Sequence, residues 1–395
     1  MQALTFFNGH VVLPNSVVRG ARIQLSGQRI GSIEPHDGRI EGAIDLEGGW
    51  LMPGFIDTQV NGGGGVLFND DISVDAIATI GAAHARFGTT GFLPTLISDT
   101  LPAVSKALDA VDRAIDDGVP GVLGVHLEGP FLNPSRKGVH DDAHFRTLDD
   151  RVLDLLCRPR RGLVMMTLAP ELCRKGDIAR LVASGVRVAA GHTDATYSQI
   201  VEAMDEGLDG ITHLYNAMSP LHHRDLGVVG AALDDGRAWC GLIADGAHVL
   251  PAAIRIAMHL LPADKLMLVT DAMPSVGAEQ KDFILQGKAI SVADGICLGP
   301  DAQLAGSDLD MTRAVSNIVT LAGARPDEAA RMASANPAAF LRVESDRGKL
   351  RPGARADLVM LDARLKARMT WIGGLRASDA YERAATLRKR HISLV

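Results

Sequence analysis

Eight apolar runs of strand length recur along the middle of the chain and alternate with amphipathic segments of helix length. Stretches such as VDAIATIGAAHARF and LPAVSKALDAVDRAIDDG place apolar residues three and four positions apart, as helices with one buried face do. Because continuous apolar strands are typical of sheets covered on both faces, the alternation predicts an α/β fold, a (β/α)8 barrel of the TIM type. The eight runs are WLMPGFIDTQV, GTTGFLPTL, GVLGVHLEGP, LVMMTLAP, VRVAAGHT, GITHLYNAM, WCGLIADG and LMLVTDAM.

Both ends of the chain have a different pattern, with short alternating runs separated by glycine turns. The first fifty residues contain ALTFFNG, RIQLSGQRIGSI and AIDLEGG, and the tail contains GKLRPGARADLVMLDARLKARMTWIGG. These runs predict short strands, and strands from the two ends can pair with one another. We therefore expect residues 1–50 and 345–395 to form a small β-sandwich domain and residues 51–344 to form the catalytic barrel.

The competing α/β architecture is the doubly wound open sheet. That fold would place a G-x-G-x-x-G loop, or a P-loop with its lysine, after the first strand. The corresponding loop reads NGGGGVLFND and has neither feature. The barrel is therefore the favoured interpretation.

Composition and charge exclude several classes of function. The net charge is −7 and no run is rich in Lys or Arg, which argues against nucleic acid as a partner. No apolar stretch approaches the ~20 residues that a membrane span needs, and the first residues lack the pattern of a secretory signal. The four cysteines show no metal-type or CxxC spacing. We expect a cytoplasmic protein with reduced thiols and no membrane or nucleic-acid partner.

Four of the predicted strands end on a residue that can bind a metal ion or move a proton: Glu128, His192, His213 and Asp271. The C-terminal ends of barrel strands converge on one cavity, so we expect these side chains to meet. Two histidines and a glutamate are a ligand set of catalytic zinc sites, which leave a position for water. Each residue alone could be an ordinary polar group at a strand end. The four together favour a metal-dependent enzyme in which Asp271 is the acid and base.

Two further histidines lie near the first of these residues. His126 lies two positions before Glu128, on the same face of an extended strand, and a place in the barrel core is favoured for it over metal binding. His140 follows in the loop RKGVH, where it could reach over the cavity and polarise a carbonyl, although an exposed loop histidine fits the same pattern.

A phosphate site needs backbone N–H groups together with arginine or histidine. The loops NAMSPLHHRD and DGAH offer such groups at Asn216, Ala217, Arg224 and His248. Basic residues in loops are usually only solvated, so this pattern alone leaves the phosphate site open.

Taken together, these segments resemble the amidohydrolase superfamily and, within it, the N-acetylglucosamine-6-phosphate deacetylase family. The resemblance covers nearly the whole chain and implies a metal-bearing (β/α)8 barrel with a small β-sandwich built from both termini. The matching segments are PGFIDTQVNGGGG, HLEGPFLNPSRKGVH, GHTDAT, THLYNAMSPLHHR, IADGAHV, VTDAMP, LAGSDLDM and GKLRPGARADLVMLD.

Carried over residue by residue, the resemblance implies that Glu128, His192 and His213 bind the metal and that Asp271 is the acid and base. It implies a homodimer or larger homo-oligomer, in which Arg224 acts across the interface. It implies substrate contacts at Val139, His140, Asn216, Ala217, Arg224, His248, Leu304, Ala305 and Gly306.

One position departs from the superfamily pattern. Many amidohydrolases have a His-x-His pair after the first strand that holds a second metal, whereas this chain has Gln59 and Asn61 there. An amide binds a divalent cation far more weakly than an imidazole or a carboxylate does. We therefore expect one divalent ion per subunit, Zn2+, with Fe2+, Co2+ and Mn2+ as alternatives because two histidines and a glutamate do not select among them.

The activity that the resemblance implies is hydrolysis of N-acetyl-D-glucosamine 6-phosphate to acetate and D-glucosamine 6-phosphate. Two alternatives within enzymes are deacetylation of N-acetylgalactosamine 6-phosphate and another amidohydrolase reaction. A third is an inactive scaffold protein descended from an enzyme. The complete set of ligands and acid/base argues against the scaffold, and Arg224 with His248 favours a phosphorylated amino sugar as the partner molecule.

Overall fold

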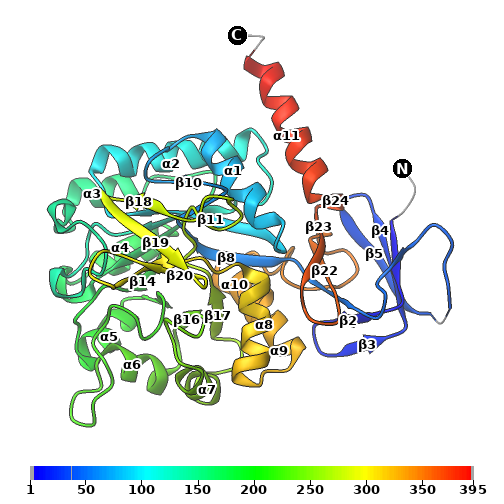
Figure 1. Ribbon diagram of the computed structural model, residues 1–395. Helices are drawn as coiled ribbons and strands as arrows, with labels where there is room; N and C mark the ends of the chain where they lie inside the picture. The colour runs from blue at the N-terminus through cyan, green and yellow to red at the C-terminus, as the bar shows by residue number, and fades with distance from the viewer. Residues whose placement is uncertain (1–3, 37, 393–395) are drawn as a thin grey trace.

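The structure of the protein is a computed structural model that describes residues 4–36 and 38–392. At its centre lies an eight-stranded sheet in which every neighbouring pair is parallel (Figure 1). Each predicted apolar run supplies one strand, so the (β/α)8 prediction is confirmed. The strands are β8 (Phe55–Val60), β11 (Thr89–Ile97), β12 (Gly124–Glu128), β13 (Leu163–Leu168), β14 (Arg187–Ala190), β15 (Gly210–Ile211), β16 (Trp239–Ile243) and β17 (Leu266–Val269).

The first and last strands meet and close the barrel. The N–H of Asp271, just beyond β17, donates to the carbonyl of Gln59 in β8 at 3.0 Å, and Val60 forms a parallel bridge with Ala272. This seam brings two positions singled out in the sequence, Gln59 and Asp271, to the same end of the barrel.

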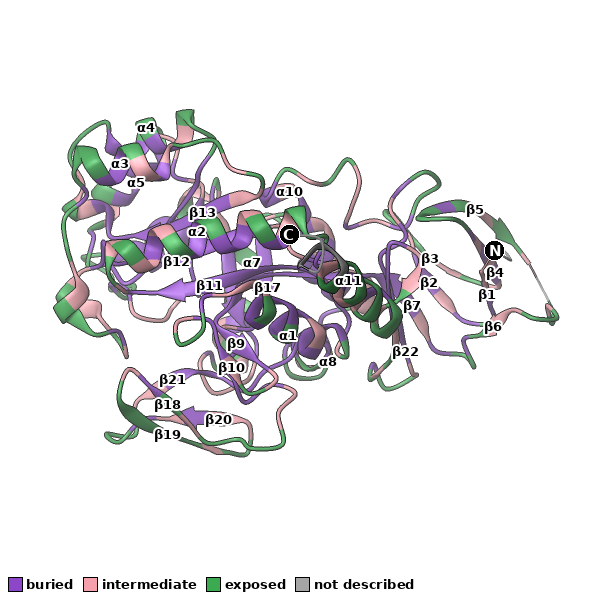
Figure 2. Ribbon diagram, turned by 90° about the horizontal axis from the view of Figure 1, so that it is seen from above, coloured by how far each residue is buried: buried purple, intermediate pink, exposed green. Residues whose placement is uncertain are grey.

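Helices cover the outside of the barrel and turn their apolar sides toward the sheet (Figure 2). In α2, buried residues at Val104, Leu108 and Val111 follow the predicted spacing of three and four. The helices of this layer are α1 (Val74–Ala85), α2 (Leu101–Asp116), α3 (Asp150–Leu156), α4 (Asp177–Ala183), α5 (Tyr197–Asp205), α6 (Gly227–Asp235), α7 (Pro251–Leu260) and α8 (Met311–Ala322), followed by α9 (Pro326–Ala330), a π-helical turn (Arg331–Ala335) and α10 (Asn336–Phe340). Among the described residues, every helix is too short or too polar to cross a membrane.

Strands from both ends of the chain form two sheets beside the barrel, as predicted (right side of Figure 1). Met52 of β7 pairs with Val359 of β22, which joins the two ends in one sheet. The sheets share a core that contains Phe6 and Trp371, whose rings meet edge to face at 4.8 Å. One sheet has the order β5 (Arg29–Pro35), β4 (Ala21–Ser26), β1 (Thr5–Phe7), β6 (Ile44–Asp45), and the other β24 (Leu375–Arg376), β23 (Ala367–Ile372), β22 (Leu358–Leu361), β7 (Trp50–Pro53), β2 (His10–Val12), β3 (Val17–Arg19). The domain boundaries at residues 50 and 345 remain a prediction.

A C-terminal helix, α11 (Ala377–Ile392), was not expected from the sequence. It leaves the β sheets after β24 and projects from the molecule (Figure 1). Its first turns are anchored by packing and a hydrogen bond: Ala380 and Ala384 are buried, and the hydroxyl of Tyr381 donates to the carbonyl of Pro120 at 2.8 Å. Further along the helix, Arg388 pairs with Asp75 of α1 at 3.5 Å. The helix therefore ties the terminal sheets to the barrel.

A small antiparallel sheet is inserted between β17 and α8. Its strands are β18 (Phe283–Leu285), β19 (Lys288–Ala293), β20 (Ile296–Leu298) and β21 (Leu304–Ser307). The apolar face of the sheet packs against Ile97 and Val139, and Ser307 bridges to Ala272 beyond β17. The inserted sheet therefore lies at the C-terminal ends of the barrel strands, where the predicted site residues are.

Candidate metal centre and active site

The four predicted strand-end residues lie at equivalent places in the barrel. Glu128 is the last residue of β12, and His192, His213 and Asp271 each lie two residues beyond the end of their strands. These three have backbone φ angles of 49°, 34° and 53°, a conformation that is uncommon for residues with a side chain. Such backbone strain concentrates at functional sites. In each case the turn directs the side chain over the mouth of the barrel.

The side chains of Glu128, His192 and His213 converge on one point. The Nε2 atoms of His192 and His213 lie 3.2 Å and 3.0 Å from the same carboxylate oxygen of Glu128, and 3.1 Å from each other. Ligand atoms bound tetrahedrally to zinc at about 2.0–2.1 Å would lie about 3.3 Å apart. The three side chains therefore have the spacing of a ligand set for a divalent first-row ion.

The ring of His192 is held in the tautomer that metal binding requires. Its Nδ1 lies 2.8 Å from the carbonyl oxygen of Arg136. A carbonyl can only accept, so Nδ1 carries the proton and the lone pair of Nε2 points at Glu128 and His213. Two imidazole nitrogens this close repel unless a proton or a cation lies between them and the carboxylate.

The charges of the cluster support the same conclusion. Burial would raise the pKa of Glu128, but the hydrogen bonds of His192 and His213 hold it well below its usual range. Burial opposes a charge on His213, but Glu128 outweighs burial and raises the pKa of the imidazole. The carboxylate is thus ionised and stabilises positive charge at this point, which a bound cation would supply.

His140 joins the cluster from its loop but differs in protonation. The ligand atoms of Glu128, His140 and His192 lie within 4.8 Å of one another. The Nδ1 of His140 accepts the backbone N–H of Ser98 at 3.3 Å and lies 2.8 Å from the Ser98 hydroxyl. Burial, and after it the neighbouring His192, lowers the pKa of His140 to about 3, so the ring is neutral and its proton is on Nε2. A neutral N–H donor in this place suits the polarisation of a carbonyl.

His126 lies below this cluster, inside the barrel. Its Nε2 is 2.7 Å from the hydroxyl of Thr167 and its Nδ1 is 3.4 Å from the hydroxyl of Thr95. Both ring nitrogens face barrel-core hydroxyls, which agrees with the core position favoured from the sequence.

Asp271 lies beside the cluster with one carboxylate oxygen held by amides. Its Oδ1 accepts from Asn61 at 2.6 Å and from Gln59 at 3.2 Å, and the same Gln59 nitrogen lies 3.2 Å and 3.1 Å from the two oxygens of Glu128. Burial, and after it the charge of Glu128, raises the pKa of Asp271 to about 6. The carboxyl group can therefore both accept and return a proton near neutral pH.

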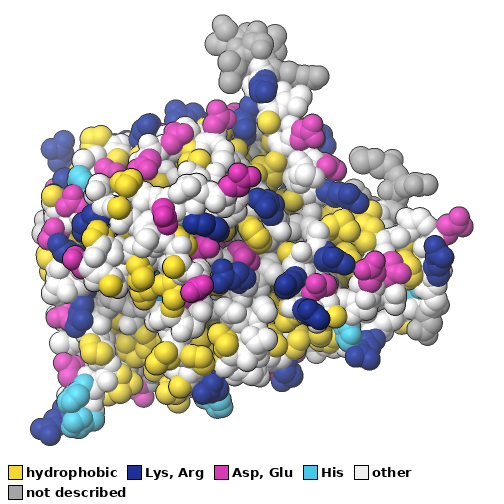
Figure 3. Space-filling view, in the orientation of Figure 1, with side chains coloured by type: hydrophobic (Ala, Val, Ile, Leu, Met, Phe, Trp, Pro, Cys, Tyr) yellow, Lys and Arg dark blue, Asp and Glu magenta, His cyan; other side chains and the backbone are white. Residues whose placement is uncertain are grey.

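A cavity of about 320 Å³ lies at the C-terminal end of the barrel and is lined by Glu128, His140, His192, His213 and Asp271 among others. Ala305 is fully buried in the core of the inserted sheet, next to the lining residues Leu304 and Gly306. Arg224 lies outside the cavity of its own subunit, on an exposed loop between β15 and α6, where basic and histidine side chains project at the lower left of Figure 3. The other predicted substrate contacts line the cavity: Val139, His140, Asn216, Ala217, His248, Leu304 and Gly306.

Sequence reasoning missed several lining residues, of which Arg136 is the most informative. Its carbonyl oxygen accepts the hydrogen bond of the His192 Nδ1–H, and its guanidinium pairs with Asp194 at 2.8 Å. The His248 ring is fixed in a similar way, because its Nδ1 lies 2.6 Å from the carboxylate of Asp245. Nothing in the spacing of the RKGVH loop indicates that the arginine carbonyl orients a histidine far away in the chain.

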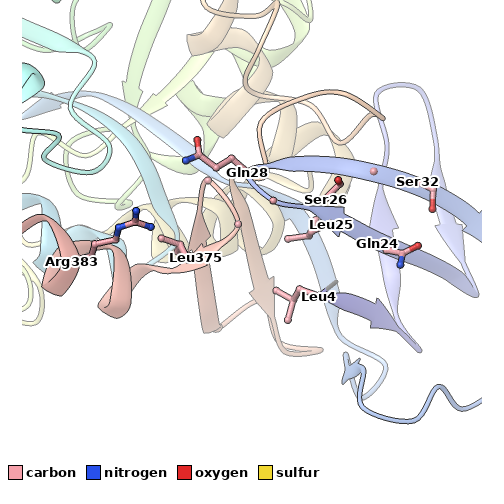
Figure 4. Close-up of a pocket in the computed structure, with 12 residues that line it drawn as sticks. Leu4, Gln24, Leu25, Ser26, Gln28, Ser32, Leu375 and Arg383 are labelled. Atoms are coloured by element: carbon pink, nitrogen blue, oxygen red, sulfur yellow. The ribbon is translucent and has the colours of Figure 1, made fainter. Parts of the chain in front are cut away.

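A larger cavity of about 500 Å³ lies elsewhere, between the β4–β5 hairpin and the start of α11 (Figure 4). Its lining includes Leu4, Gln24, Gln28 and Leu375, and Arg383 is the one charged residue among the described lining residues. Because it has neither a carboxylate nor an imidazole, this cavity offers no acid/base or metal-binding group. The smaller cavity is the candidate active site.

Comparison with known proteins agrees with this geometry. The model of the amidohydrolase family matches residues 50–384. One relative is the N-acetylgalactosamine-6-phosphate deacetylase of Shewanella sp. (strain ANA-3), which is 41% identical over 83% of this chain and 83% of its own length. Another is the N-acetylglucosamine-6-phosphate deacetylase of Homo sapiens, which is 38% identical over 84% of each chain. The crystal structure of N-acetylglucosamine-6-phosphate deacetylase from Pasteurella multocida superposes with a TM-score of 0.91 at 34% identity, over 95% of this chain and 99% of that one. The chain belongs to the amidohydrolase family.

Proposed function

We propose that the protein hydrolyses the acetamide of N-acetyl-D-glucosamine 6-phosphate and releases acetate and D-glucosamine 6-phosphate. The observation that carries the proposal is the convergence of Glu128, His192 and His213 beside Asp271, in a cavity that also presents His140 and His248. Relatives over most of the chain length are deacetylases of amino-sugar 6-phosphates.

One divalent ion, Zn2+, would be held by Glu128, His192 and His213. When bound, such an ion lowers the pKa of water to about 7 and polarises a carbonyl oxygen. Fe2+, Co2+ and Mn2+ can use the same nitrogen and oxygen ligands. Gln59 and Asn61 place N–H donors against Glu128 and Asp271, in the space between the carboxylates, which supports a single ion rather than a pair.

Asp271 takes the proton of the attacking water and later gives it to the departing amine. Before an ion binds, the pKa of Asp271 is raised to about 6, so the carboxylate is mostly ionised at neutral pH yet more basic than an exposed aspartate, which suits both steps. His140 donates its Nε2–H to the acetyl oxygen as that oxygen becomes negative. A donor aimed at a developing oxyanion in this way contributes about 3–4 kcal/mol to the stability of the transition state.

The 6-phosphate would be held at the side of the cavity formed by Asn216, Ala217 and His248. Binding there orients the sugar and directs the acetamide toward Asp271. Arg224 is exposed and does not line the cavity of its own subunit, so we propose that it reaches the phosphate in a second copy of the chain, in a homodimer or a larger homo-oligomer. The four free cysteines fit a cytoplasmic location.

N-acetylgalactosamine 6-phosphate is the second candidate substrate, favoured by the 41% identity to a deacetylase of that sugar against 38% to the human glucosamine enzyme. The two sugars differ only in the configuration at C4, and both carry the acetamide and phosphate that the cavity is proposed to bind.

Acetate release from both epimers and from their unphosphorylated forms, together with metal analysis of the purified protein, tests the proposal. We expect about one equivalent of metal and the highest kcat/KM on N-acetylglucosamine 6-phosphate. A higher kcat/KM on N-acetylgalactosamine 6-phosphate would make that sugar the preferred substrate. Failure to release acetate from either phosphorylated sugar would refute both candidate functions.

A further inference from the structure

The tip of the inserted sheet carries a residue that its turn does not favour. Leu285 of β18 pairs with Lys288 of β19, so the hairpin turn consists of Gln286 and Gly287, with φ angles of 48° and 79°. Two-residue turns with positive φ at both positions favour asparagine, aspartate or glycine at the first. Glutamine therefore strains the backbone here, and the turn itself gives no reason for it.

The side chain of Gln286 supplies a reason. Its amide nitrogen donates to the carbonyl oxygen of Ser98 at 3.0 Å, and its amide oxygen accepts the backbone N–H of Asp141 at 2.8 Å. Ser98 directly follows β11, and Asp141 directly follows His140. One amide thus joins the inserted sheet, a barrel strand and the loop that carries His140.

Both groups that Gln286 holds are next to the imidazole of His140. The Nδ1 of His140 takes its hydrogen bonds from the hydroxyl and the backbone N–H of Ser98. Asp141 is the neighbour of His140 in the chain, so fixing its N–H fixes the end of the His140 peptide unit. The His140 ring is oriented by Ser98 through hydrogen bonds and by the backbone that continues into Asp141. Gln286 bonds to both Ser98 and Asp141.

We propose that Gln286 is a positioning residue that holds His140 in place for the reaction, through Ser98 and Asp141. This role rests on the proposed function, because it assigns His140 to the acetyl oxygen. Gln286 does not line the cavity, so the proposed role acts through other residues and needs no contact with the substrate. Its loss should therefore misplace a donor that matters in the transition state and leave ground-state binding of the sugar phosphate intact.

The substitution Gln286→Asn separates positioning from folding. Asparagine is better suited to the turn, so the melting temperature should stay the same or rise, but its side chain is one methylene shorter and cannot span both partners. We expect kcat to fall about tenfold with KM unchanged within about twofold, as a slightly misplaced catalytic group gives. Gln303→Asn is the matched control. Gln303 lies in the turn between β20 and β21 of the inserted sheet, and its amide oxygen accepts the backbone N–H of Asp301. Its side chain bonds neither Ser98 nor Asp141, so this variant should keep the wild-type kcat.

A double-mutant cycle tests whether Gln286 acts through His140. In a His140→Asn background, Gln286→Asn should add no further loss of kcat. A wild-type kcat in Gln286→Asn, or an equal loss in both backgrounds, would overturn the proposal.

A measurement without turnover keeps the positioning role distinct from the proposed function. In protein labelled with 15N-histidine, the His140 ring signals can be assigned by their absence in His140→Asn. We expect them to shift or broaden in Gln286→Asn and to stay unchanged in Gln303→Asn. If the wild type releases no acetate while these signals shift, the proposed function fails and the positioning of the ring stands. If the wild type is active and the signals do not move, the positioning role fails alone.

Discussion

Replacing Asp271 with asparagine isolates the proton transfer from the rest of the site. The amide keeps the size of the carboxyl group, and its oxygen can still accept from Asn61 and Gln59, which hold Oδ1 in the wild type. Glu128, His192 and His213 are not changed, so the variant should retain its metal. What is lost is the group that takes and returns the proton.

The expected loss follows from the role of Asp271 in both proton transfers. General acid–base catalysis contributes about 10²–10⁴-fold, so we expect kcat to fall about 10³-fold, or about 4 kcal/mol in activation free energy. The pKa of the free carboxyl is raised to about 6 by burial and by Glu128. In the metal-loaded wild type the positive charge of the ion lowers this pKa. We therefore expect kcat/KM to rise with pH through a midpoint at or below about 6 as Asp271 ionises, and this acidic limb should be absent from the residual activity of Asp271→Asn.

The same raised pKa has a consequence for stability with a definite sign. A carboxyl group with a higher pKa in the folded than in the unfolded state makes the fold less stable as pH rises from about 4 through about 6. Metal-free Asp271→Asn should thus melt at a higher temperature than the metal-free wild type at pH 7, and at a similar temperature near pH 4.

Acetate release measured by proton NMR, with metal content measured by mass spectrometry, checks the activity prediction. A metal-loaded Asp271→Asn protein that keeps more than about a tenth of the wild-type kcat would refute the assignment of Asp271 as acid and base, since general acid–base catalysis contributes at least about 10²-fold.

Three further predictions concern the metal, the phosphate and the terminal sheets. Glu128→Gln should lose both metal and activity, because it removes the charge that the two histidines share; retention of one metal equivalent would contradict this, and Asp271→Asn is the control. Arg224→Ala should raise KM for the phosphorylated sugar and leave the melting temperature unchanged. Mixed oligomers of Arg224→Ala and Asp271→Asn should recover a low KM, because the Arg224→Ala subunits keep Asp271 and receive Arg224 from their neighbour; no recovery would contradict action across the interface. Trp371→Ala should lower the free energy of unfolding by about 3–5 kcal/mol in chemical denaturation, since the ring is 1% exposed against Phe6; a loss below about 1 kcal/mol would contradict the packing.

The barrel and the convergence of the candidate ligands could be predicted because both depend on local pattern. A parallel strand buried on both faces appears in the sequence as a continuous apolar run, and the polar residue that ends it lies at the rim of the barrel. The run GITHLYNAM shows the limit of this reasoning. Only Gly210–Ile211 is a strand, because His213, Tyr215 and Ala217 have positive φ angles and turn the chain into the cavity.

The features that could not be predicted depend on tertiary contacts or lack a pattern. The helix α11 is strongly charged and buries few residues, so its sequence has only a faint apolar period. The orientation of His140 depends on Ser98 and Gln286, which lie far from it in the chain, and neither shows a chemical signal of its own in the sequence.

The hydrogen bond between Asp271 and Gln59 closes the barrel at the candidate active site. The bond that joins the last barrel strand to the first is made by the backbone of Asp271, the proposed acid and base, and its acceptor is Gln59, whose side-chain amide donates to Glu128. An opening of the barrel at this junction would separate Asp271 from Glu128, His192 and His213. If these residues act as proposed, we expect turnover to be lost on heating before the helices unfold.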